Sequence, residues 1–313
     1  MAGNLFELAK QRILVTGATG FLGSHLCRYL STIAAEVHAI SRRRQFGHDH
    51  LRWWQGDLSD FATAQRLLQS IQPDVIFHLT AHTWGGPGVE LVQPTLRDDL
   101  VATVNLLTAA TELKLRRLVL TGSLEEPQPG SPEAVPSSPY AAAKWASGAY
   151  ARMFHQLYGT PTVILRIFMT YGPGQPAKKL IPYTILSLLN RESPKLSNGQ
   201  RLIDWIYVDD VIRGLVSAAQ APGIEGATID LGSGHLRSIL DVVEQLVARV
   251  SPGTRPVFGA APARPMEPIR AAKIDEAYER LGWTPLTPWD HGLELTIDWY
   301  RREFSSQAAK LRD

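Results

Sequence analysis

Continuous apolar runs of strand length recur between residues 12 and 168, separated by segments with helical spacing. Runs without strict alternation are typical of strands buried on both faces of a parallel sheet. Between them, apolar residues three and four apart form stripes, as at Leu96, Leu100, Val104 and Leu107. Strand and helix in alternation predict the α/β class, a doubly wound parallel sheet with right-handed crossovers. The expected strands are Arg12–Thr16, Val37–Ile40, Asp74–Leu79, Arg117–Thr121 and Thr162–Phe168.

The pattern loosens after Gly174, where prolines and glycines become frequent and helical spacing dominates. Two later strand-like runs, Leu202–Val208 and Ala227–Leu231, are expected to return to the main sheet. We therefore expect a main domain over residues 1–172, with 201–233 returning to it. A smaller, mostly helical C-terminal domain is expected over 173–200 and 234–313.

Composition narrows the class of partner. Lys and Arg (32) nearly balance Asp and Glu (30), and the net charge of +2 argues against nucleic acid or an acidic membrane as the main partner. No apolar run approaches the roughly 18 residues of a membrane span, and the first eleven residues do not have the pattern of a secretory signal. The single cysteine, Cys27, excludes an internal disulfide and a multi-cysteine metal site. We expect a cytoplasmic protein without a metal.

A glycine-rich turn, Thr16-Gly-Ala-Thr-Gly-Phe-Leu-Gly23, joins the first expected strand to the first expected helix. Gly17 permits the tight turn, Gly20 lets the backbone approach a pyrophosphate, and Gly23 lets the helix pack closely on the sheet. The helix N-terminus offers N–H groups and the positive end of its dipole to the phosphates. The three glycines could form only a strand–helix turn, but their placement favours dinucleotide binding by the main domain.

The end of the second strand indicates which dinucleotide binds. An NAD site usually has a carboxylate about 20 residues after the glycine turn, where it holds the ribose 2′-hydroxyl. This chain has Ser41-Arg-Arg-Arg44 there, with no acid from Val37 to Gly47. Arginine forks match a 2′-phosphate and would tolerate no neighbouring carboxylate. We expect NADP, with NAD as the other option and a solvated basic turn as the alternative. Asp57 is expected either to bond the adenine amino group or to cap its loop.

Tyr140 and Lys144 stand four residues apart in a helix that follows a proline-rich loop, so they share one helical face. The preceding strand ends in Thr121-Gly-Ser123, and open α/β sheets bind ligands outside such strand ends. A phenol has an ordinary pKa of about 10, and a nearby ammonium lowers it. The phenol can then exchange a proton with an alcohol as a hydride moves. Ser123 is expected to orient the reacting oxygen. The alternative is that Tyr140 and Lys144 are two ordinary residues on a helix surface.

Seven motifs occur in a fixed order: the glycine turn, Gly56-Asp-Leu58, Phe77-His-Leu-Thr-Ala81, Thr121-Gly-Ser123, Tyr140-x-x-x-Lys144, Tyr171-Gly-Pro173 and Tyr207-Val-Asp-Asp210. With this order the chain resembles the extended short-chain dehydrogenase/reductase family. The resemblance is to its NAD(P)-dependent nucleotide-sugar epimerase/dehydratase branch, and it runs from about Arg12 to Glu303.

This resemblance implies a Rossmann domain, a nicotinamide cofactor, and a nucleoside-diphosphate sugar held by the C-terminal, substrate-binding domain. It also implies a homodimer formed through two helices, expected at Leu96–Leu113 and Tyr140–Tyr158. Cofactor contacts are expected from Gly17, Thr19, Gly20, Phe21, Leu22, Gly23, Ser41, Arg42, Arg43, Asp57, Leu58, Leu79, Ala81, Tyr140 and Lys144. Substrate contacts are expected from His82, Trp84, Met169, Arg201 and Arg264.

The chain departs from the family pattern at several of these positions. Asp99 stands where the family commonly has asparagine, and Met169 replaces another asparagine that contacts the sugar diphosphate. Ile203 replaces an arginine, although Arg201 lies nearby. Arg264 matches a late family arginine on the diphosphate, with a plain loop arginine as the alternative. Trp84 could stack on a pyranose ring or belong to a core or lid.

Glu125, two residues after Ser123, bears on the reaction. In family dehydratases a glutamate here removes the proton beside a transient 4-ketone, whereas a solvent-facing carboxylate is the alternative. Leu124 stands where dTDP-glucose-type dehydratases have an acid, and the expected NADP site suits a reductase that exchanges its cofactor. We therefore favour 4-ketoreduction of a nucleoside-diphosphate sugar. A 4,6-dehydratase or 4-epimerase with internal hydride return is the alternative, and a non-catalytic NADP sensor is the remote one.

Overall fold

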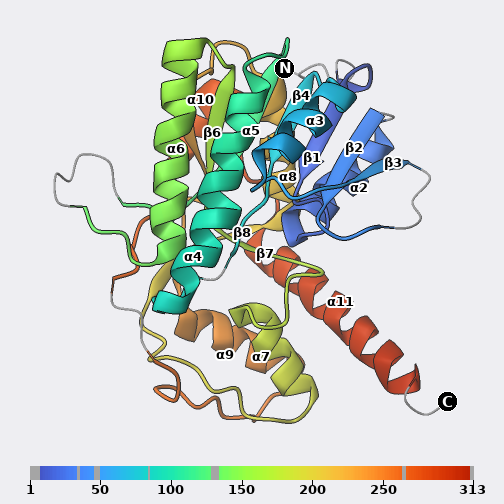
Figure 1. The fold of residues 1–313 in the computed structure, drawn as a ribbon. Helices are drawn as coiled ribbons and strands as arrows, with labels where there is room; N and C mark the ends of the chain where they lie inside the picture. Colours follow the sequence, from blue (N-terminus) through green and yellow to red (C-terminus); the bar gives the residue numbers. More distant parts are fainter. Residues whose placement is uncertain are drawn as a thin grey trace. The chain divides into compact units, whose positions relative to one another are not determined.

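The structure, a computed structural model, describes residues 8–33, 36–45, 50–83, 85–127, 134–262 and 266–310, with side chains as far as 306 (Figure 1). The chain forms two compact units. The first comprises Met1–Ile167, Ile212–Leu231 and Lys273–Thr284, and the second comprises Phe168–Val211, Gly232–Ala272 and Pro285–Asp313.

The first unit is built on a parallel sheet in which the described residues supply seven strands, in the order β3-β2-β1-β4-β5-β6-β9. The order reverses between β1 and β4, and in open α/β sheets a ligand is expected at the carboxyl ends of the two strands beside such a reversal. The expected doubly wound α/β fold is confirmed. The strands are β1 Arg12–Thr16, β2 Glu36–Ser41, β3 Leu51–Gln55, β4 Val75–His78, β5 Arg117–Ser123, β6 Thr162–Ile167 and β9 Thr228–Leu231.

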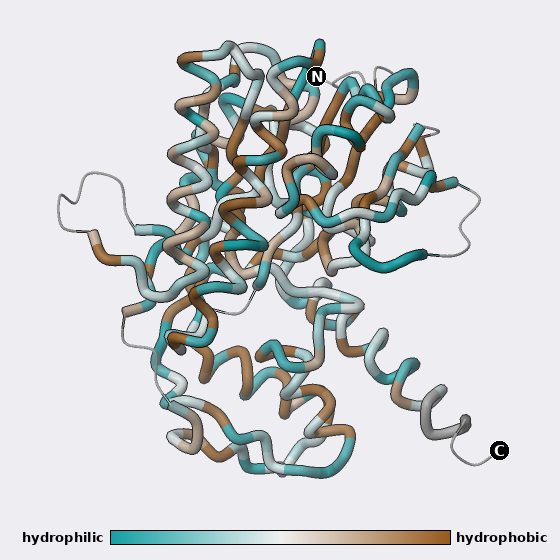
Figure 2. The backbone as a smooth tube through the Cα atoms, in the orientation of Figure 1, coloured by the Kyte–Doolittle hydropathy of each residue, from teal (hydrophilic) through white to brown (hydrophobic). Residues whose placement is uncertain are grey.

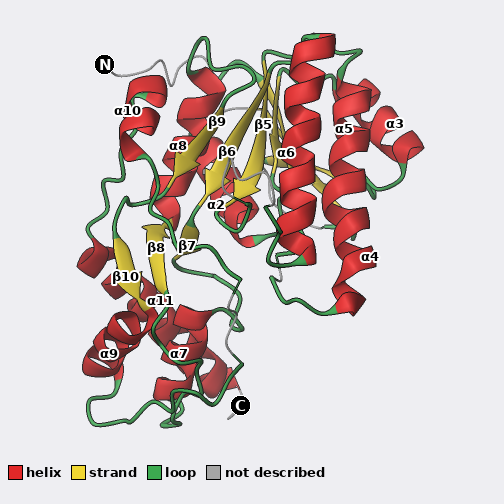
Figure 3. Cartoon of the chain, turned by 90° about the vertical axis from the view of Figure 1, so that its left-hand side faces the viewer, coloured by secondary structure: helices red, strands yellow, loops and turns green. Residues whose placement is uncertain are grey.

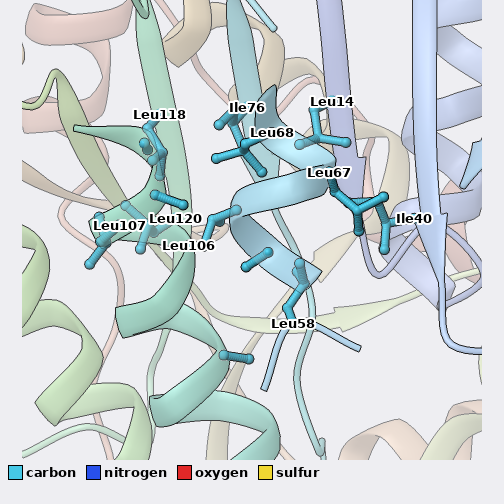
Figure 4. Packing of buried hydrophobic residues seen from close by; sticks show 14 of the residues in the cluster. Leu14, Ile40, Leu58, Leu67, Leu68, Ile76, Leu106, Leu107, Leu118 and Leu120 are labelled. Carbon is cyan, nitrogen blue, oxygen red and sulfur yellow. The ribbon is translucent and has the colours of Figure 1, made fainter. Parts of the chain in front are cut away.

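Helices cover both faces of this sheet, with α3, α5 and α6 on one face and α2 and α8 on the other (Figure 3). The inner strands are mostly apolar because both faces of the sheet are covered (Figure 2). Leu67 and Leu68 of α3 pack with Leu106 and Leu107 of α5 against the sheet (Figure 4). The helical elements are α2 Phe21–Thr32, α3 Phe61–Ile71, η1 Val89–Leu91, α4 Val92–Thr95, η2 Leu96–Val101, α5 Ala102–Ala110, α6 Pro139–Tyr158, α8 Val208–Gln220 and α10 Ile274–Leu281.

Strand β3 lies at the edge of the sheet, and its half-exposed sequence has no continuous apolar run. The expected helical stripe beginning at Leu96 is only partly right. Residues 96–101 form a π-helical turn, which breaks the four-residue repeat. Leu96 is exposed, whereas Asp98 and Asp99 are buried in its place.

The second unit contains a separate three-stranded sheet in the order β10-β8-β7. The expectation that Leu202–Val208 returns to the main sheet is therefore wrong: β8 pairs parallel with β7 and antiparallel with β10. An apolar run predicts burial of a strand but does not identify its neighbours, and β9 takes the place beside β6. The elements are β7 Met169–Tyr171, β8 Leu202–Tyr207, β10 Leu236–Ser238, α7 Leu180–Leu189, α9 Ile239–Val250 and α11 Trp289–Lys310.

A buried carboxylate fixes the middle of β8. Asp204 accepts hydrogen bonds from the backbone N–H groups of Ser233 (2.7 Å), Gly234 (2.9 Å) and Ala272 (2.9 Å). These bonds satisfy donors of two loops in one place, as buried polar groups require.

None of the described helices is long and apolar enough to cross a membrane.

Candidate active site

The glycine turn between β1 and α2 is closely packed on one side. Gly17 has φ +67°, and a Cβ there would lie 2.8 Å from the backbone of Leu79 and Thr80. A Cβ on Gly23 would lie 2.1 Å from the carbonyl oxygen of Gly17. Only glycine fits at these two positions because any side chain would strike backbone atoms.

The other side of the turn can receive a phosphate. Gly20 is the N-cap of α2, and no side chain caps the helix there. A Cβ on Gly20 would meet only the carbonyl oxygen of Gly17, at 3.1 Å, and Thr19 and Gly20 are exposed. The first turn of α2, which includes Phe21 and Leu22, therefore directs unpaired backbone donors outward, as anion sites at helix N-termini do. This cradle fits the pyrophosphate of a dinucleotide.

The basic segment after β2 has a carboxylate beside it. Arg42 and Arg43 are exposed, and Ser41 Oγ accepts a hydrogen bond from the Arg43 backbone N–H (3.2 Å). Arg42 Nη1 donates to Asp98 Oδ2 at 2.9 Å, and Arg97 Nε donates to Asp98 Oδ1 at 2.8 Å. Burial would raise the pKa of Asp98, but the two guanidinium groups hold that pKa below its usual value. An acid therefore lies beside Arg42, contrary to the expectation of a site without carboxylates.

The structure places Asp57 in its own turn. Its Oδ1 accepts bonds from the backbone N–H (2.9 Å) and the hydroxyl (2.8 Å) of Ser59. This is the loop cap that was one of the two expected roles. Asn105 of α5 donates to the carbonyl oxygen of the adjacent, buried Leu58 (2.9 Å), which ties this loop to α5.

Helix α6 brings Tyr140 and Lys144 to the end of β5. The helix begins at Pro139 after the N-cap Ser138, whose Oγ accepts from the Ala141 N–H at 3.1 Å. Tyr140 forms a side-chain hydrogen bond with Ser123 of β5. Lys144 Nζ donates to the carbonyl oxygen of Thr121 at 2.9 Å. The phenol and the ammonium therefore both face the carboxyl end of β5, where the sequence predicts a catalytic group.

The pKa of Tyr140 differs from the expectation. Burial raises it above the ordinary phenol value, the charge of Glu125 raises it further, and the hydrogen bond with Ser123 only partly offsets them. Burial also lowers the pKa of Lys144, which donates to Thr121 in β5. The phenol is thus protonated at neutral pH in this state of the protein, ready to donate a hydrogen bond or a proton.

Two glutamates after Ser123 have different environments. Glu125 is half-buried, its backbone N–H donates to Ser123 Oγ (3.1 Å), and its carboxylate lies against Gly85. Glu126 is buried and accepts the Ser123 backbone N–H at 2.7 Å. Glu126 Oε2 also lies 3.7 Å from Arg166 Nε. Glu125 is therefore the carboxylate beside Tyr140, whereas Glu126 holds the strand end that carries Ser123.

A buried polar chain connects the glycine turn with the π-helical turn, and sequence reasoning missed it. His78 bonds through Nδ1 to Thr16 Oγ1 (2.8 Å) and through Nε2 to Thr103 Oγ1 (2.9 Å). Thr103 Oγ1 donates to the carbonyl oxygen of Asp99 at 2.5 Å, so it must accept from His78. His78 is therefore protonated at Nε2 and accepts at Nδ1 from Thr16. The only sequence signal was a histidine inside an apolar strand.

Asp99, which replaces the usual family asparagine, is buried beside Lys144. Its Oδ1 accepts the backbone N–H of His82 at 2.5 Å. Burial raises the pKa of Asp99, and the charge of Lys144 opposes that rise. Asp99 thus holds the loop after β4, which contains Leu79, Ala81 and His82.

The remaining expected substrate residues are placed separately. Trp84 and Arg264 lie outside the described residues. Met169 begins β7 and Arg201 precedes β8, both in the second unit. Arg201 forms an ion pair with the buried Glu267. Its charge is therefore compensated within the unit.

Comparisons with known proteins agree with this geometry. The family model described as the NAD-dependent epimerase/dehydratase family matches residues 13–232. A protein of Sinorhizobium fredii (strain NBRC 101917 / NGR234), named probable dTDP-glucose 4,6-dehydratase, is 29% identical over 92% of this chain and 92% of its own length. The UDP-glucuronic acid 4-epimerase of Bacillus cereus, solved with UDP-glucuronic acid and NAD, is 28% identical with a TM-score of 0.82, over 93% of this chain and 99% of that one. MoeE5, solved with UDP-glucose and NAD, is 30% identical with a TM-score of 0.82, over 94% and 99%.

Proposed function

The chain belongs to the NAD-dependent epimerase/dehydratase family of extended short-chain dehydrogenase/reductases, and we propose that it is a nucleotide-sugar 4,6-dehydratase. Its substrate would be a nucleoside-diphosphate hexose. The sugar would be oxidised at C4, dehydrated across C5 and C6, and then reduced at C6, all within one active site. The relatives named dTDP-glucose 4,6-dehydratases support this reaction. The observation that carries it is Glu125, a half-buried carboxylate held beside the Ser123–Tyr140 hydroxyl pair.

The side chains have distinct roles in this reaction. Tyr140, once deprotonated, takes the proton of the C4 hydroxyl, and Ser123 orients that oxygen through its bond to the phenol. The ammonium of Lys144, anchored on Thr121, stabilises the phenolate that must form before this step, against the burial and the charge of Glu125 that favour the neutral phenol. Glu125 then removes the proton at C5, which the C4 ketone has made acidic. A nicotinamide dinucleotide, when bound at the glycine turn, supplies the hydride acceptor and donor.

Leu124 favours one second candidate. It is buried at 5% exposure, where dTDP-glucose-type dehydratases usually have an acid. Loss of a hydroxyl as water needs a proton from such a group. With leucine there, Glu125 would have to return its own proton to the leaving hydroxyl. A 4-epimerase needs no such acid, so 4-epimerisation is the second candidate, in accord with the Bacillus cereus 4-epimerase among the similar structures.

The expectation of net 4-ketoreduction with NADP depends on a basic site without an acid. Asp98 on Arg42 removes that argument, and two similar structures were solved with NAD. We therefore infer that the protein keeps its cofactor and returns the hydride to the sugar. The three arginines after β2 still provide positive charge that would accept NADP.

The test uses the purified protein with dTDP-, UDP-, GDP- and CDP-glucose in deuterated water. Dehydration predicts a product one water lighter that carries solvent deuterium at C5. The Glu125→Gln variant should lose both, whereas Glu112→Gln, which removes an exposed acid after α5, should lose neither. Epimerised product without deuterium at C5 would assign the second candidate. Consumption of added NADPH in proportion to product would contradict internal return.

We also propose that the protein is a homodimer formed by the outer faces of η2 and α6. Leu96, Val101, Trp145 and Tyr150 are large apolar side chains exposed on these elements. Beside them is a hollow of about 540 Å³, lined largely by apolar residues of α4, η2 and the start of α6. An exposed apolar surface of this kind marks an interface. Light scattering should give twice the chain mass for the native protein and one chain mass for Trp145→Asp; a native monomer would refute the proposal.

A further inference from the structure

Asp98 reaches the cofactor-selective end of β2 from a different element. The side chain that follows this strand usually discriminates a ribose 2′-hydroxyl from a 2′-phosphate. Ser41, Arg42 and Arg43 occupy that segment, and none of them is acidic. Asp98 lies 56 positions later in η2, yet its Oδ2 accepts from Arg42 Nη1 at 2.9 Å. The carboxylate absent from the strand is therefore supplied by the helix.

The position of Asp98 is built into the fold. The residue is only 8% exposed, although a lone aspartate on a helix is ordinarily solvated. The π-helical turn brings Asp98 and Asp99 together to the inner side of the helix, whereas Leu96 of the same turn is exposed. The second oxygen of Asp98 is held by Arg97 Nε at 2.8 Å. Both oxygens thus have cationic partners, so the carboxylate is fixed before any ligand arrives.

A carboxylate in this place opposes a 2′-phosphate in two ways. It neutralises the guanidinium that would bind the phosphate, and its own charge repels the phosphate dianion. A 2′-hydroxyl carries no charge and can donate to a carboxylate. Arg42 has an exposed side chain, at 60%, so it can exchange between Asp98 and a ligand. The balance at this site is therefore set by Asp98 as much as by the arginines.

We propose that Asp98 is a specificity-determining residue of the cofactor site, which weakens binding of a dinucleotide 2′-phosphate by competing for Arg42. This inference rests on the proposed function only in that the glycine turn binds a nicotinamide dinucleotide. It concerns which dinucleotide is held and is independent of the sugar reaction.

The test measures the dissociation constants of NADPH and NADH for the full-length protein by fluorescence titration, without a sugar substrate. Asp98→Asn keeps the shape of the side chain and removes its charge. The ratio of NADPH to NADH dissociation constants should fall about fivefold, as expected for loss of one partly exposed ion pair. Adding Arg42→Ala to Asp98→Asn should remove most of that gain, because the released guanidinium binds the phosphate and only the relief of direct repulsion remains.

Two further variants control the result. Glu112→Gln changes the net charge equally at an exposed position after α5, and should leave the ratio unchanged. Arg97→Met removes the second, largely exposed partner and leaves Asp98 to Arg42 alone, so the ratio should rise. This variant keeps the inference testable even if Asp98→Asn folds poorly.

An unchanged ratio in Asp98→Asn, or a gain that is equally large without Arg42, would overturn the inference while the native protein still binds a dinucleotide. Failure of the native protein to bind either dinucleotide would overturn both this inference and the proposed function. Binding with an altered ratio but no conversion of any nucleotide sugar would support the role of Asp98 and refute the proposed reaction.

Discussion

His78 provides a prediction about stability that depends directly on the buried polar chain. The side chain is 2% exposed, and both ring nitrogens have partners, Thr16 and Thr103. Because Thr103 must accept from Nε2, the ring has no place for a second proton at Nδ1 without losing the bond from Thr16. Burial, reinforced by the charge of Lys144, lowers the pKa of His78 from 6.5 to about 3.

The magnitude follows from the linkage between proton binding and folding. Between pH 6.5 and about 3 the unfolded chain binds a proton at His78 that the folded protein does not bind. This contribution to stability is therefore complete above pH 6.5 and is lost as the pH falls toward 3. A shift of one pKa unit corresponds to about 1.4 kcal/mol. From pH 7 to pH 5 the free energy of unfolding should fall by about 2 kcal/mol through this group alone.

The assay compares urea unfolding of the native protein and His78→Gln at pH 7 and pH 5, followed by circular dichroism. Glutamine can still hydrogen-bond but cannot titrate. The variant should be less stable at pH 7, and its free energy of unfolding should fall by about 2 kcal/mol less than that of the native protein on acidification. Groups common to both proteins cancel in this difference. Equal losses of unfolding free energy in the two proteins would show that His78 titrates normally in the folded state. That result would refute the proposed burial and hydrogen bonding of His78 between Thr16 and Thr103.

Three other substitutions test the site. Tyr140→Phe should abolish turnover of nucleotide sugars while the dissociation constant of NADH stays unchanged, and retained turnover would remove the phenol from the reaction. Gly17→Ala should lower dinucleotide affinity and cost about 1–3 kcal/mol of stability; the control Gly223→Ala has a similar φ of +69° but no atom within 4 Å of the new Cβ, so it should leave affinity intact. Glu126→Ala should cost about 2 kcal/mol in urea unfolding, because the buried Ser123 N–H loses its acceptor; no loss would show that Glu126 does not support the strand end.

Local patterns in the sequence predict the positions of those candidate site residues that lie within one strand–turn–helix unit. The glycine turn after β1 and the Tyr140–Lys144 pair on α6 each depend on spacing over a few residues. Topology then places them together, since parallel strands end at one edge of the sheet. Continuous apolar runs predict the inner strands because such a run is also a local pattern of a few residues.

Contacts between distant residues were not predictable in this way. Asp98 lies 56 positions from Arg42, and no spacing rule links a helix to the end of β2. The π-helical turn that buries Asp98 and Asp99 has no signal in an apolar stripe. The raised pKa of Tyr140 follows from burial and the surrounding acids, whereas the sequence indicated only the lysine one turn away. Membership of β8 in a second sheet was hidden for a related reason, because a buried strand can pair with any neighbour.

Internal return of the hydride to the sugar can be tested in a single labelling experiment. A nucleoside-diphosphate glucose carrying deuterium at C4 is converted by the protein with unlabelled cofactor, and the product is analysed by mass spectrometry. The proposed reaction predicts a product one water lighter that retains the deuterium, now at C6. Product without the label, or label found in the released cofactor, would contradict the proposed reaction.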